Sequence, residues 1–254
     1  MQGTGERPAA REDLLIGRNT VLELLRTQSA VECIYLQKGL SGTISKIAAM
    51  ARDKDIVLKE VDAKKLDSLC GLGNHQGVIA QIAAAHYSEM ADIFSKAGDE
   101  PLFVVFCDGI EDPHNLGAIL RSAEAAGAHG VVIPKRRSAG LSWVVGKTSA
   151  GALNHLPVVR VPNLVAAMET LKKQGVWFYA ADMGGQPWCA VDYAGPVGLV
   201  VGAEGSGVSR LVREKCDFAV SLPMRGKIAS LNASVAAGIV LYEIARQRMK
   251  LQST

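Results

Sequence analysis

From Leu102 onward the chain alternates short apolar segments with amphipathic segments, and this alternation restricts the fold more than any other feature. Apolar runs of strand length are predicted at residues 102–108, 130–134, 156–161, 176–182, 197–202 and 218–223. Helical periodicity is predicted between them at residues 116–128, 143–153, 163–175 and 208–216, and in a final helix over 232–250. Strands that are apolar throughout and separated by helices favour a mostly parallel sheet covered on both faces. The predicted fold class is therefore α/β.

A second, smaller α/β pattern occupies residues 13–84, so we expect two domains. Its predicted strands lie at residues 31–39, 56–62 and 73–83, and its predicted helices at 15–27, 41–55 and 64–70. Residues 1–12 are expected to be a flexible tail. Residues 85–100 are less periodic and are interpreted as a linker with one helical piece, which Pro101 closes. The larger domain is expected to cover residues 101–254.

The composition and the missing motifs exclude several classes of protein. No apolar run approaches the roughly 18 residues that a membrane span needs, and the first residues lack the apolar core of a secretory signal. Five cysteines without a CxxC pair favour a reducing cytoplasm over a disulfide framework or a zinc site. No P-loop lysine pattern, HExxH, GxSxG or acidic metal cluster occurs, which disfavours kinases, proteases, α/β-hydrolases and metal-dependent nucleases. We expect no metal site.

Charge is distributed unevenly along the chain, although its net value is only +3. Residues 101–254 hold 16 basic and 11 acidic side chains, whereas residues 1–100 hold 12 basic and 14 acidic ones. The triplet Lys135-Arg136-Arg137 lies in the basic part. Such a triplet is typical of a phosphate-facing patch, and equally of a solvated loop.

The segment 108–123, DGIEDPHNLGAILRSA, follows the first apolar run and places polar residues at a strand end, where α/β sheets build their sites. Asn115 could cap the following helix or face a ligand. Arg121 has apolar neighbours in the sequence, and a guanidinium on a mostly apolar helix is costly unless it meets an anion or a polar pocket. His114 is interpreted as a loop residue, because a histidine without a placed partner is a weak catalytic candidate.

The segment 201–207, VGAEGSG, is a glycine-rich loop after a late strand. A dinucleotide-binding fingerprint belongs after the first strand of its fold, so this loop matches that motif poorly. A carboxylate at Glu204 would also repel a pyrophosphate. Glu204 more naturally contacts a cation or a hydroxyl-bearing ligand, unless the loop is simply a turn that feeds a helix.

The segment 221–237, SLPMRGKIASLNASVAA, leads from the last predicted strand into the final helix. Ser230 and Asn232 are both good capping residues, and capping alone explains at least one of them. The backbone of this loop, with Met224 and Leu231 as apolar cover, would suit a flat heterocycle.

Taken together, the three segments resemble the motifs of the SpoU (TrmH-type) branch of the SPOUT RNA methyltransferases, and the resemblance covers residues 101–250. The NxGxxxR pattern of the first family motif is matched by Asn115, Gly117 and Arg121. The GxExxG pattern of the second is matched by Gly202, Glu204 and Gly207. The PMxGxxxSLNxS pattern of the third is matched by Pro223, Met224, Gly226, Ser230, Leu231, Asn232 and Ser234. The intervening KTSAGALNHLPV is also typical of the family, and Leu222 and Ala233 are small departures from it.

The resemblance implies a specific architecture and cofactor. The family has a C-terminal trefoil knot, in which the chain after about Val197 threads through an earlier loop. The knot loops bind S-adenosylmethionine, which implies cofactor contacts at Gly202, Leu222, Met224, Leu231 and Ala181. Residues 13–84, with GRNTVLELL and HQGV, resemble the small L30e-like domain that binds substrate in this family. Family members usually form homodimers through the knot region and the final helix.

The resemblance also implies methylation of a ribose 2′-hydroxyl in RNA, and the two-domain layout is most similar to family members that modify a guanosine of 23S ribosomal RNA. The implied catalytic residues are Asn115, Arg121, Glu204, Ser230 and Asn232. The implied RNA contacts are Arg18, Asn19, Lys38, Lys135 and Arg136. Three alternatives stay open: a transfer RNA ribose methylase, a resistance-type ribosomal RNA methylase, and an RNA-binding assembly factor without catalysis.

Overall fold

The computed structural model describes residues 13–26, 31–39, 41–70 and 74–249. The tail expected at residues 1–12 and the expected end of the final helix at Lys250 lie outside the described residues. The chain divides into two compact units. The first contains the described residues up to 86 together with 141–143, and the second contains residues 87–140 and 144–249.

The first unit is a four-stranded sheet with three helices. Its elements are β1 (Leu14–Ile16), α1 (Arg18–Arg26), β2 (Val31–Gln37), α2 (Thr43–Asp53), β3 (Val57–Val61), α3 (Ala63–Cys70) and β4 (Val78–Ile82). The strand order is β1-β4-β2-β3, in which β4 runs antiparallel to β1 and β2, while β2 and β3 are parallel. Val21, Ile34 and Ile47 are fully buried in its core. The start of the chain was expected to be helical from residue 15, but Leu14–Ile16 pairs with β4, and Gly17 with φ 97° separates it from α1.

The second unit is built on a six-stranded sheet whose pairs are all parallel. The strands are β5 (Phe103–Asp108), β6 (Gly130–Pro134), β7 (Val158–Val161), β8 (Trp177–Pro187), β9 (Val197–Gly202) and β10 (Phe218–Ser221). Their order is β10-β8-β9-β5-β6-β7. The parallel α/β arrangement predicted from the alternation of segments is therefore confirmed. β5, in the middle of the sheet, is buried along its first five residues.

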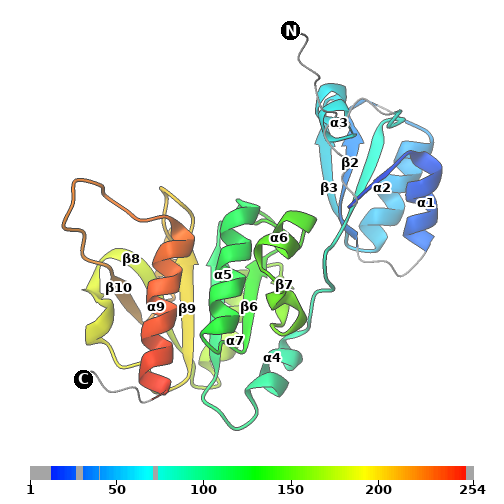
Figure 1. The fold of residues 1–254 in the computed structure, drawn as a ribbon. Coiled ribbons are helices and arrows are strands. Elements are labelled where there is room, and N and C mark those ends of the chain that lie inside the picture. The colour runs from blue at the N-terminus through cyan, green and yellow to red at the C-terminus, as the bar shows by residue number, and fades with distance from the viewer. Residues whose placement is uncertain (1–12, 27–30, 40, 71–73, 250–254) are drawn as a thin grey trace. The chain divides into compact units, whose positions relative to one another are not determined.

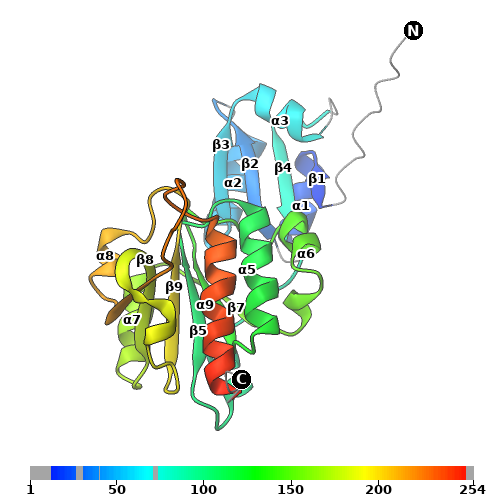
Figure 2. The same ribbon diagram turned by 60° about the vertical axis from the view of Figure 1, so that its left-hand side comes forward.

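Helices cover both faces of this sheet. The helices are α4 (Met90–Ala97), α5 (Pro113–Ala125), α6 (Trp143–Thr148), α7 (Leu164–Lys172), α8 (Arg210–Arg213) and α9 (Ala233–Arg248), with short 3-10 turns η1 (Ala152–Asn154) and η2 (Trp188–Ala190). α4, α7 and α8 pack with alternate strand residues in one apolar cluster. α5 and α9 run side by side over the opposite face (Figures 1 and 2).

Two predictions about these helices need correction. The segment 85–100 was expected to be a linker with one helical piece; the helix is present as α4, but it belongs to the second unit, since Ile93 is fully buried in the sheet's core. α8 spans four residues instead of the predicted nine. Ser209 stands at its N-terminus but makes no side-chain cap, and its N–H donates to Asp108.

Local residues fix the ends of these helices. Asn163 caps α7 by accepting a hydrogen bond from the N–H of Ala166 at 3.2 Å. Gly127 and Gly175, which follow α5 and α7, have φ of 79° and 85°, the left-handed conformation that glycine adopts most easily. Within the described residues, no helix is long and apolar enough to cross a membrane.

Candidate active site

The three predicted motifs meet at the carboxyl edge of the six-stranded sheet. Asp108 at the end of β5 pairs with Gly202 at the end of β9, and Ala181 in β8 pairs with Val201. β10 ends at Ser221 on the far side of β8. Ligands of open parallel sheets bind outside the carboxyl ends of the strands. The register thus places the glycine-rich loop, the helix mouth after β5 and the loop after β10 around one edge.

Asn115, Glu204 and Asn232 form the polar centre of this edge. The Asn115 amide donates to the Glu204 carboxylate at 3.2 Å. The Asn232 amide donates to the carbonyl oxygen of the Asn115 side chain at 2.8 Å and also to Glu204. Residues 115, 204 and 232 come from three separate motifs, so the fold assembles a cluster that the sequence pattern could only suggest.

Asn115 is held in place by burial, because it is only 7% exposed in the first turn of α5. It is not the cap of that helix. Asp112 takes that role by accepting a hydrogen bond from the N–H of His114 at 2.9 Å, and Pro113 opens the helix. The side-chain amide of Asn115 is therefore free to serve the site.

Asn232 combines capping with its contacts to the cluster. Its side-chain oxygen accepts hydrogen bonds from the N–H of Ser234 at 2.9 Å and from the N–H of Val235 at 3.2 Å, which caps α9. The Ser234 hydroxyl donates to the same oxygen at 2.6 Å. These bonds orient the Asn232 amide nitrogen toward Asn115 and Glu204.

A tight turn presents Glu204. Ala203 and Gly207 exchange two backbone hydrogen bonds, at 3.1 and 2.9 Å, so that the chain reverses over residues 203–207. At Gly202 a Cβ atom would lie 2.1 Å from the carbonyl carbon of Gly207 and 2.2 Å from the nitrogen of Val208. Only glycine allows the backbone to fold back this closely.

The loop between β10 and α9 offers backbone groups and apolar cover. Among residues 222–231, all of them described, no backbone group is hydrogen-bonded to another backbone group. Met224 and Leu231 are 37% and 38% exposed beside them. Free N–H and C=O groups next to apolar side chains fit a neutral, flat heterocycle such as adenine. Gly202 ends β9 and Leu222 directly follows β10, while Ala181 is the last residue of β8 that pairs with β9.

Arg121 lies on the outer side of α5. It is exposed, and within the described residues its side chain has no hydrogen-bond partner. It therefore meets no anion or polar pocket in the described part of its own chain, and Glu204 bonds to the two asparagines. The helical period could have shown this, since residues 114, 121 and 125 share the exposed side of α5.

The remaining predicted site residues contribute less to the observed geometry. Ser230 is exposed, and its side chain makes no hydrogen bond to the described part of the chain. Arg136 is exposed and Lys135 is half-buried, both directly after β6. In the first unit, the Arg18 side chain donates to the carbonyl oxygen of Gln76 at 2.9 Å. Its guanidinium thus supports the turn before β4, while the neighbouring Asn19 is exposed.

Two acidic residues of this edge escaped the sequence analysis. Asp108 accepts a hydrogen bond from the N–H of Ser209 at 2.7 Å and so ties β5 to the start of α8. Asp182 pairs with the Arg213 guanidinium at 3.0 Å beside the glycine turn. Both are polar residues that follow a buried strand segment, and this position was the signal that could have identified them.

Cysteine and metal chemistry find no support at this edge. Burial, with the nearby charge of Asp108, raises the pKa of the Cys107 thiol to about 12, so that a thiolate is not formed near neutral pH. Cys107 is a fully buried core residue of β5. Within the described residues, no three histidine, cysteine or acidic side chains are grouped as a metal site.

Known families match both units of the chain. The model of the SpoU rRNA methylase family matches residues 102–242. The chain belongs to this family. The model for RNA 2′-O ribose methyltransferase substrate binding matches residues 14–88. YacO of Bacillus subtilis, assigned to the TrmH family of tRNA/rRNA methyltransferases, is 43% identical over 243 residues, which cover 94% of this chain and 97% of YacO.

Solved structures agree with this membership. The SpoU methyltransferase AviRb from Streptomyces viridochromogenes, in complex with the cofactor AdoMet, superimposes with a TM-score of 0.60 at 27% identity and covers 93% of this chain and 90% of its own. An AdoMet-bound rRNA methyltransferase from Sinorhizobium meliloti gives 0.59 at 25% identity, with 94% and 88% covered. This chain is accordingly an RNA methyltransferase that uses S-adenosylmethionine.

Proposed function

We propose that this member of the SpoU family methylates a ribose 2′-hydroxyl, and that its target is a guanosine of 23S ribosomal RNA. The observation that carries the proposal is the Asn115–Glu204–Asn232 cluster at the edge that also holds the free backbone of residues 222–231. Two amides and a carboxylate can hold a hydroxyl group by donating to it and accepting from it. The match of residues 14–88 to a 2′-O ribose methyltransferase substrate-binding model supports the same choice.

The chemistry requires alignment more than activation. Bound S-adenosylmethionine supplies an electrophilic methyl group on its sulfonium, so the chain must position the hydroxyl oxygen and allow its proton to leave. Glu204 would accept the hydrogen bond of the 2′-hydroxyl, while Asn115 and Asn232 hold the carboxylate in place. Arg121 would clamp the adjacent phosphate and stabilise the developing alkoxide charge. Ser230 would add a hydrogen bond from the cofactor loop.

A homodimer and a knot are parts of the same proposal. α9 exposes Val235, Ile239 and Tyr242 at 50%, 37% and 55%, in steps of four and three residues along one side. Such an apolar stripe is typical of a helix that packs against a partner. Arg121 lies on α5, which packs against α9. A second copy of the chain docked on α9 would therefore place anionic or polar groups next to the Arg121 guanidinium. Residues 222–232, in the part of the chain that would thread through an earlier loop, would be one of the knot loops that bind the cofactor.

The first unit would bind RNA, and the enzyme would work in the cytoplasm, where ribosomal RNA is modified. Arg18 and Asn19 at the start of α1, with Lys38 after β2, would contribute contacts of shape and polarity. Lys38 is already paired with Asp62 at 3.6 Å, an exposed pair. Lys135 and Arg136, together with Arg137, would contact phosphates beside the catalytic edge.

The deciding experiment is methyl transfer from labelled S-adenosylmethionine to unmodified 23S ribosomal RNA and to transfer RNA, side by side. Sites are mapped by the resistance of 2′-O-methylated linkages to alkaline cleavage. One protected guanosine in the ribosomal RNA is the expected result. Protected linkages in transfer RNA alone would move the target to the other class that the relatives' names include. Label on a base, with every linkage still cleaved by alkali, would contradict ribose methylation.

A further inference from the structure

An aromatic pocket lies on the second unit, away from the catalytic edge. Trp177 and Tyr179 are two residues apart in β8, so their side chains lie on the same face of the sheet. Phe178 between them points to the opposite face and belongs to the core beneath α7. Phe218 of β10 is directly paired with Tyr179. Phe218 lies four residues before Leu222, a distance of about 13 Å along an extended strand. The pocket is therefore distinct from the cofactor loop.

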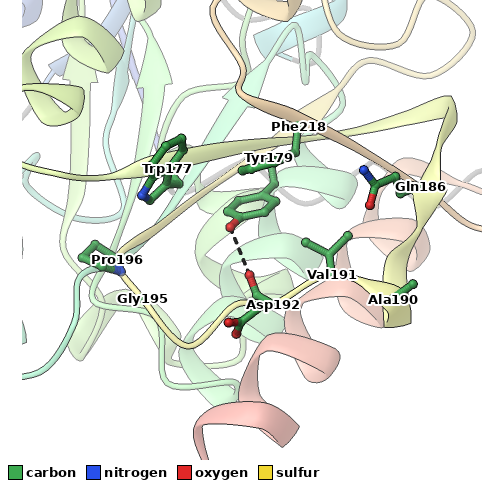
Figure 3. Close-up of a pocket in the computed structure, with 9 residues that line it drawn as sticks. All are labelled: Trp177, Tyr179, Gln186, Ala190, Val191, Asp192, Gly195, Pro196 and Phe218. Atoms are coloured by element: carbon green, nitrogen blue, oxygen red, sulfur yellow. Dashed lines mark hydrogen bonds between the residues drawn. The ribbon is translucent and has the colours of Figure 1, made fainter.

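The aromatic rings form a continuous wall. Tyr179 and Phe218 are stacked with centroids 5.0 Å apart and planes 20° apart, and Trp177 lies 5.8 Å from Phe218 at 40°. Behind them the fully buried Tyr193 packs on Tyr179 at 5.0 Å and donates its hydroxyl to the carbonyl of Trp188 at 2.9 Å. Figure 3 shows Trp177 and Tyr179 above the segment that carries Val191 and Asp192, with the Tyr179 hydroxyl bonded to Asp192. The rings are therefore held before any ligand arrives.

The space between them is large enough for a planar ligand. The open cavity has a volume of about 450 Å³, and its lining also includes Gln186, Val191 and Asp192. Trp177 is 53% exposed at its mouth. The chain is only 5% aromatic, and a cluster of this kind that leaves an indole half in solvent fits a stacking surface better than a core.

The polar groups at the mouth select the kind of ligand. Among the described residues, neither the Gln186 amide nor the indole N–H of Trp177 has a hydrogen-bond partner. Asp192 accepts a hydrogen bond from the N–H of Ala194 at 2.9 Å, and Tyr179 donates to its backbone carbonyl at 3.1 Å. None of the described residues that line the pocket is basic. A phosphate would be repelled by Asp192, whereas a flat ring with N–H donors on its edge would be bound.

We propose that this pocket binds an unpaired nucleobase of the RNA substrate, guanine best, stacked on Trp177 and Phe218 with its N–H edge toward Asp192 and Gln186. Guanine offers two adjacent N–H donors on its Watson–Crick edge, which suit a carboxylate. Stacking of bases on aromatic side chains is how proteins bind single-stranded RNA. The proposal rests on the proposed function, because it takes RNA as the substrate, and it adds a subsite that grips the strand outside the reacting nucleotide.

Two short RNA probes test the pocket directly. One is a heptaribonucleotide in which a single guanosine is flanked by abasic residues, and the other is the fully abasic heptamer with the same phosphates. In the variant Trp143→Phe/Trp188→Phe, Trp177 is the remaining tryptophan, and its fluorescence should fall saturably with the guanosine probe alone. Trp177→Ala in the otherwise unchanged chain should weaken binding of that probe about tenfold, to the level of the abasic one. Trp143→Ala, which removes an indole 44% exposed on α6, should change it less than about twofold.

Three outcomes overturn the proposal. Equal binding of both probes, or equal binding of the guanosine probe by Trp177→Ala and wild type, removes the base from the pocket. A lower mass of Trp177→Ala in light scattering means that a second copy of the chain covers the site. Methyl transfer to ribosomal RNA, measured with the same proteins, separates the claim about the pocket from the proposed function. If the wild type methylates RNA while the probes show no preference, only the pocket fails; if Trp177 is quenched by the base but no RNA is methylated, the proposed function fails.

Discussion

At the scale of single residues, Arg121 offers the sharpest separation of catalysis from stability. Its guanidinium is exposed and has no hydrogen-bond partner among the described residues, so Arg121→Lys should leave the free energy of unfolding within about 0.5 kcal/mol. A lysine keeps the charge but loses the bidentate geometry for phosphate. We expect kcat to fall about 100-fold or more, with the Kd for S-adenosylmethionine kept. Single-turnover methyl transfer and calorimetry measure the two quantities, and near-normal turnover would remove Arg121 from the mechanism.

Asn115 tests the cluster through electrostatics. In Asn115→Asp, a buried carboxylate replaces the amide that donates to Glu204, and the two acids repel. The new aspartate would have a folded-state pKa above its unfolded value, so its cost should be largest above that folded pKa and shrink as the pH falls through it. We expect a loss of about 1–3 kcal/mol at pH 8 and less at pH 5, measured by urea unfolding. The double variant Asn115→Asp/Glu204→Gln should recover most of the lost free energy of unfolding. An equal loss of unfolding free energy in the single and double variants would mean that the two side chains are not coupled.

The same residues show where sequence reasoning works and where it stops. The motifs located Asn115, Glu204 and Asn232, but their mutual hydrogen bonds join positions 89 and 117 residues apart, and no local pattern contains such a contact. The apolar sequence neighbours of Arg121 did not show that its side chain is exposed, because in a helix the residues three and four positions away share its surroundings.

At the scale of elements, the turn after β9 makes a prediction about Gly202. Any Cβ there meets the backbone of Gly207 and Val208 at 2.1–2.2 Å, and backbone cannot move aside as a flexible side chain can. Gly202→Ala should cost about 1–3 kcal/mol by overpacking and weaken S-adenosylmethionine binding by opening the 203–207 turn. Gly195→Ala is the matched control, since nothing lies within 4 Å of its Cβ position. Thermal unfolding and calorimetry measure both effects; tight cofactor binding by Gly202→Ala would show that the turn is not part of that site.

The exposed stripe of α9 makes a second prediction at this scale. Tyr242→Glu places a charge in the middle of the proposed dimer contact, and burying an unpaired charge is strongly unfavourable. Sedimentation velocity should therefore show a dimer for the wild type and a monomer for the variant. Leu211→Glu, at a side chain 61% exposed on α8, should leave the dimer intact. A wild type that sediments as a monomer would refute the dimer and the role of Arg121 across it.

Elements with strong periodicity were predictable, and those defined by pairing were not. The strands of the larger sheet begin in apolar runs, and β5, β6 and β9 are buried almost throughout, so that composition alone marks them. β1 has three residues, and its identity depends on its pairing with β4 more than sixty residues later. α4 was recognised as helical, but its place in the second unit follows from the burial of Ile93 against the sheet, which the weak pattern around it did not indicate.

At the scale of the whole molecule, convergence of the motifs was predictable, because parallel strands bring their carboxyl ends to one edge. The order of the strands in the sheet was not predictable from the sequence. The aromatic pocket illustrates the difference: Tyr179 and Phe218 are adjacent only because β10 lies beside β8 with its own register. Their sequences give no sign of partnership, since each reads as an ordinary residue of an apolar strand.

Charge distribution over the chain makes the last prediction. The first 100 residues are nearly neutral, while the remainder carries an excess of five positive charges, so most counterion release on RNA binding should come from the second part. Arg136 and Arg137 are exposed, and Arg137 has the unusual φ of 56°. Arg136→Gln/Arg137→Gln should lower the slope of log K against log salt by about 2. Arg18→Gln should leave the slope nearly unchanged, because that side chain supports Gln76. The Kd for a 23S ribosomal RNA fragment between about 50 and 300 mM salt measures both; an unchanged slope in the double variant would place the phosphate contacts elsewhere.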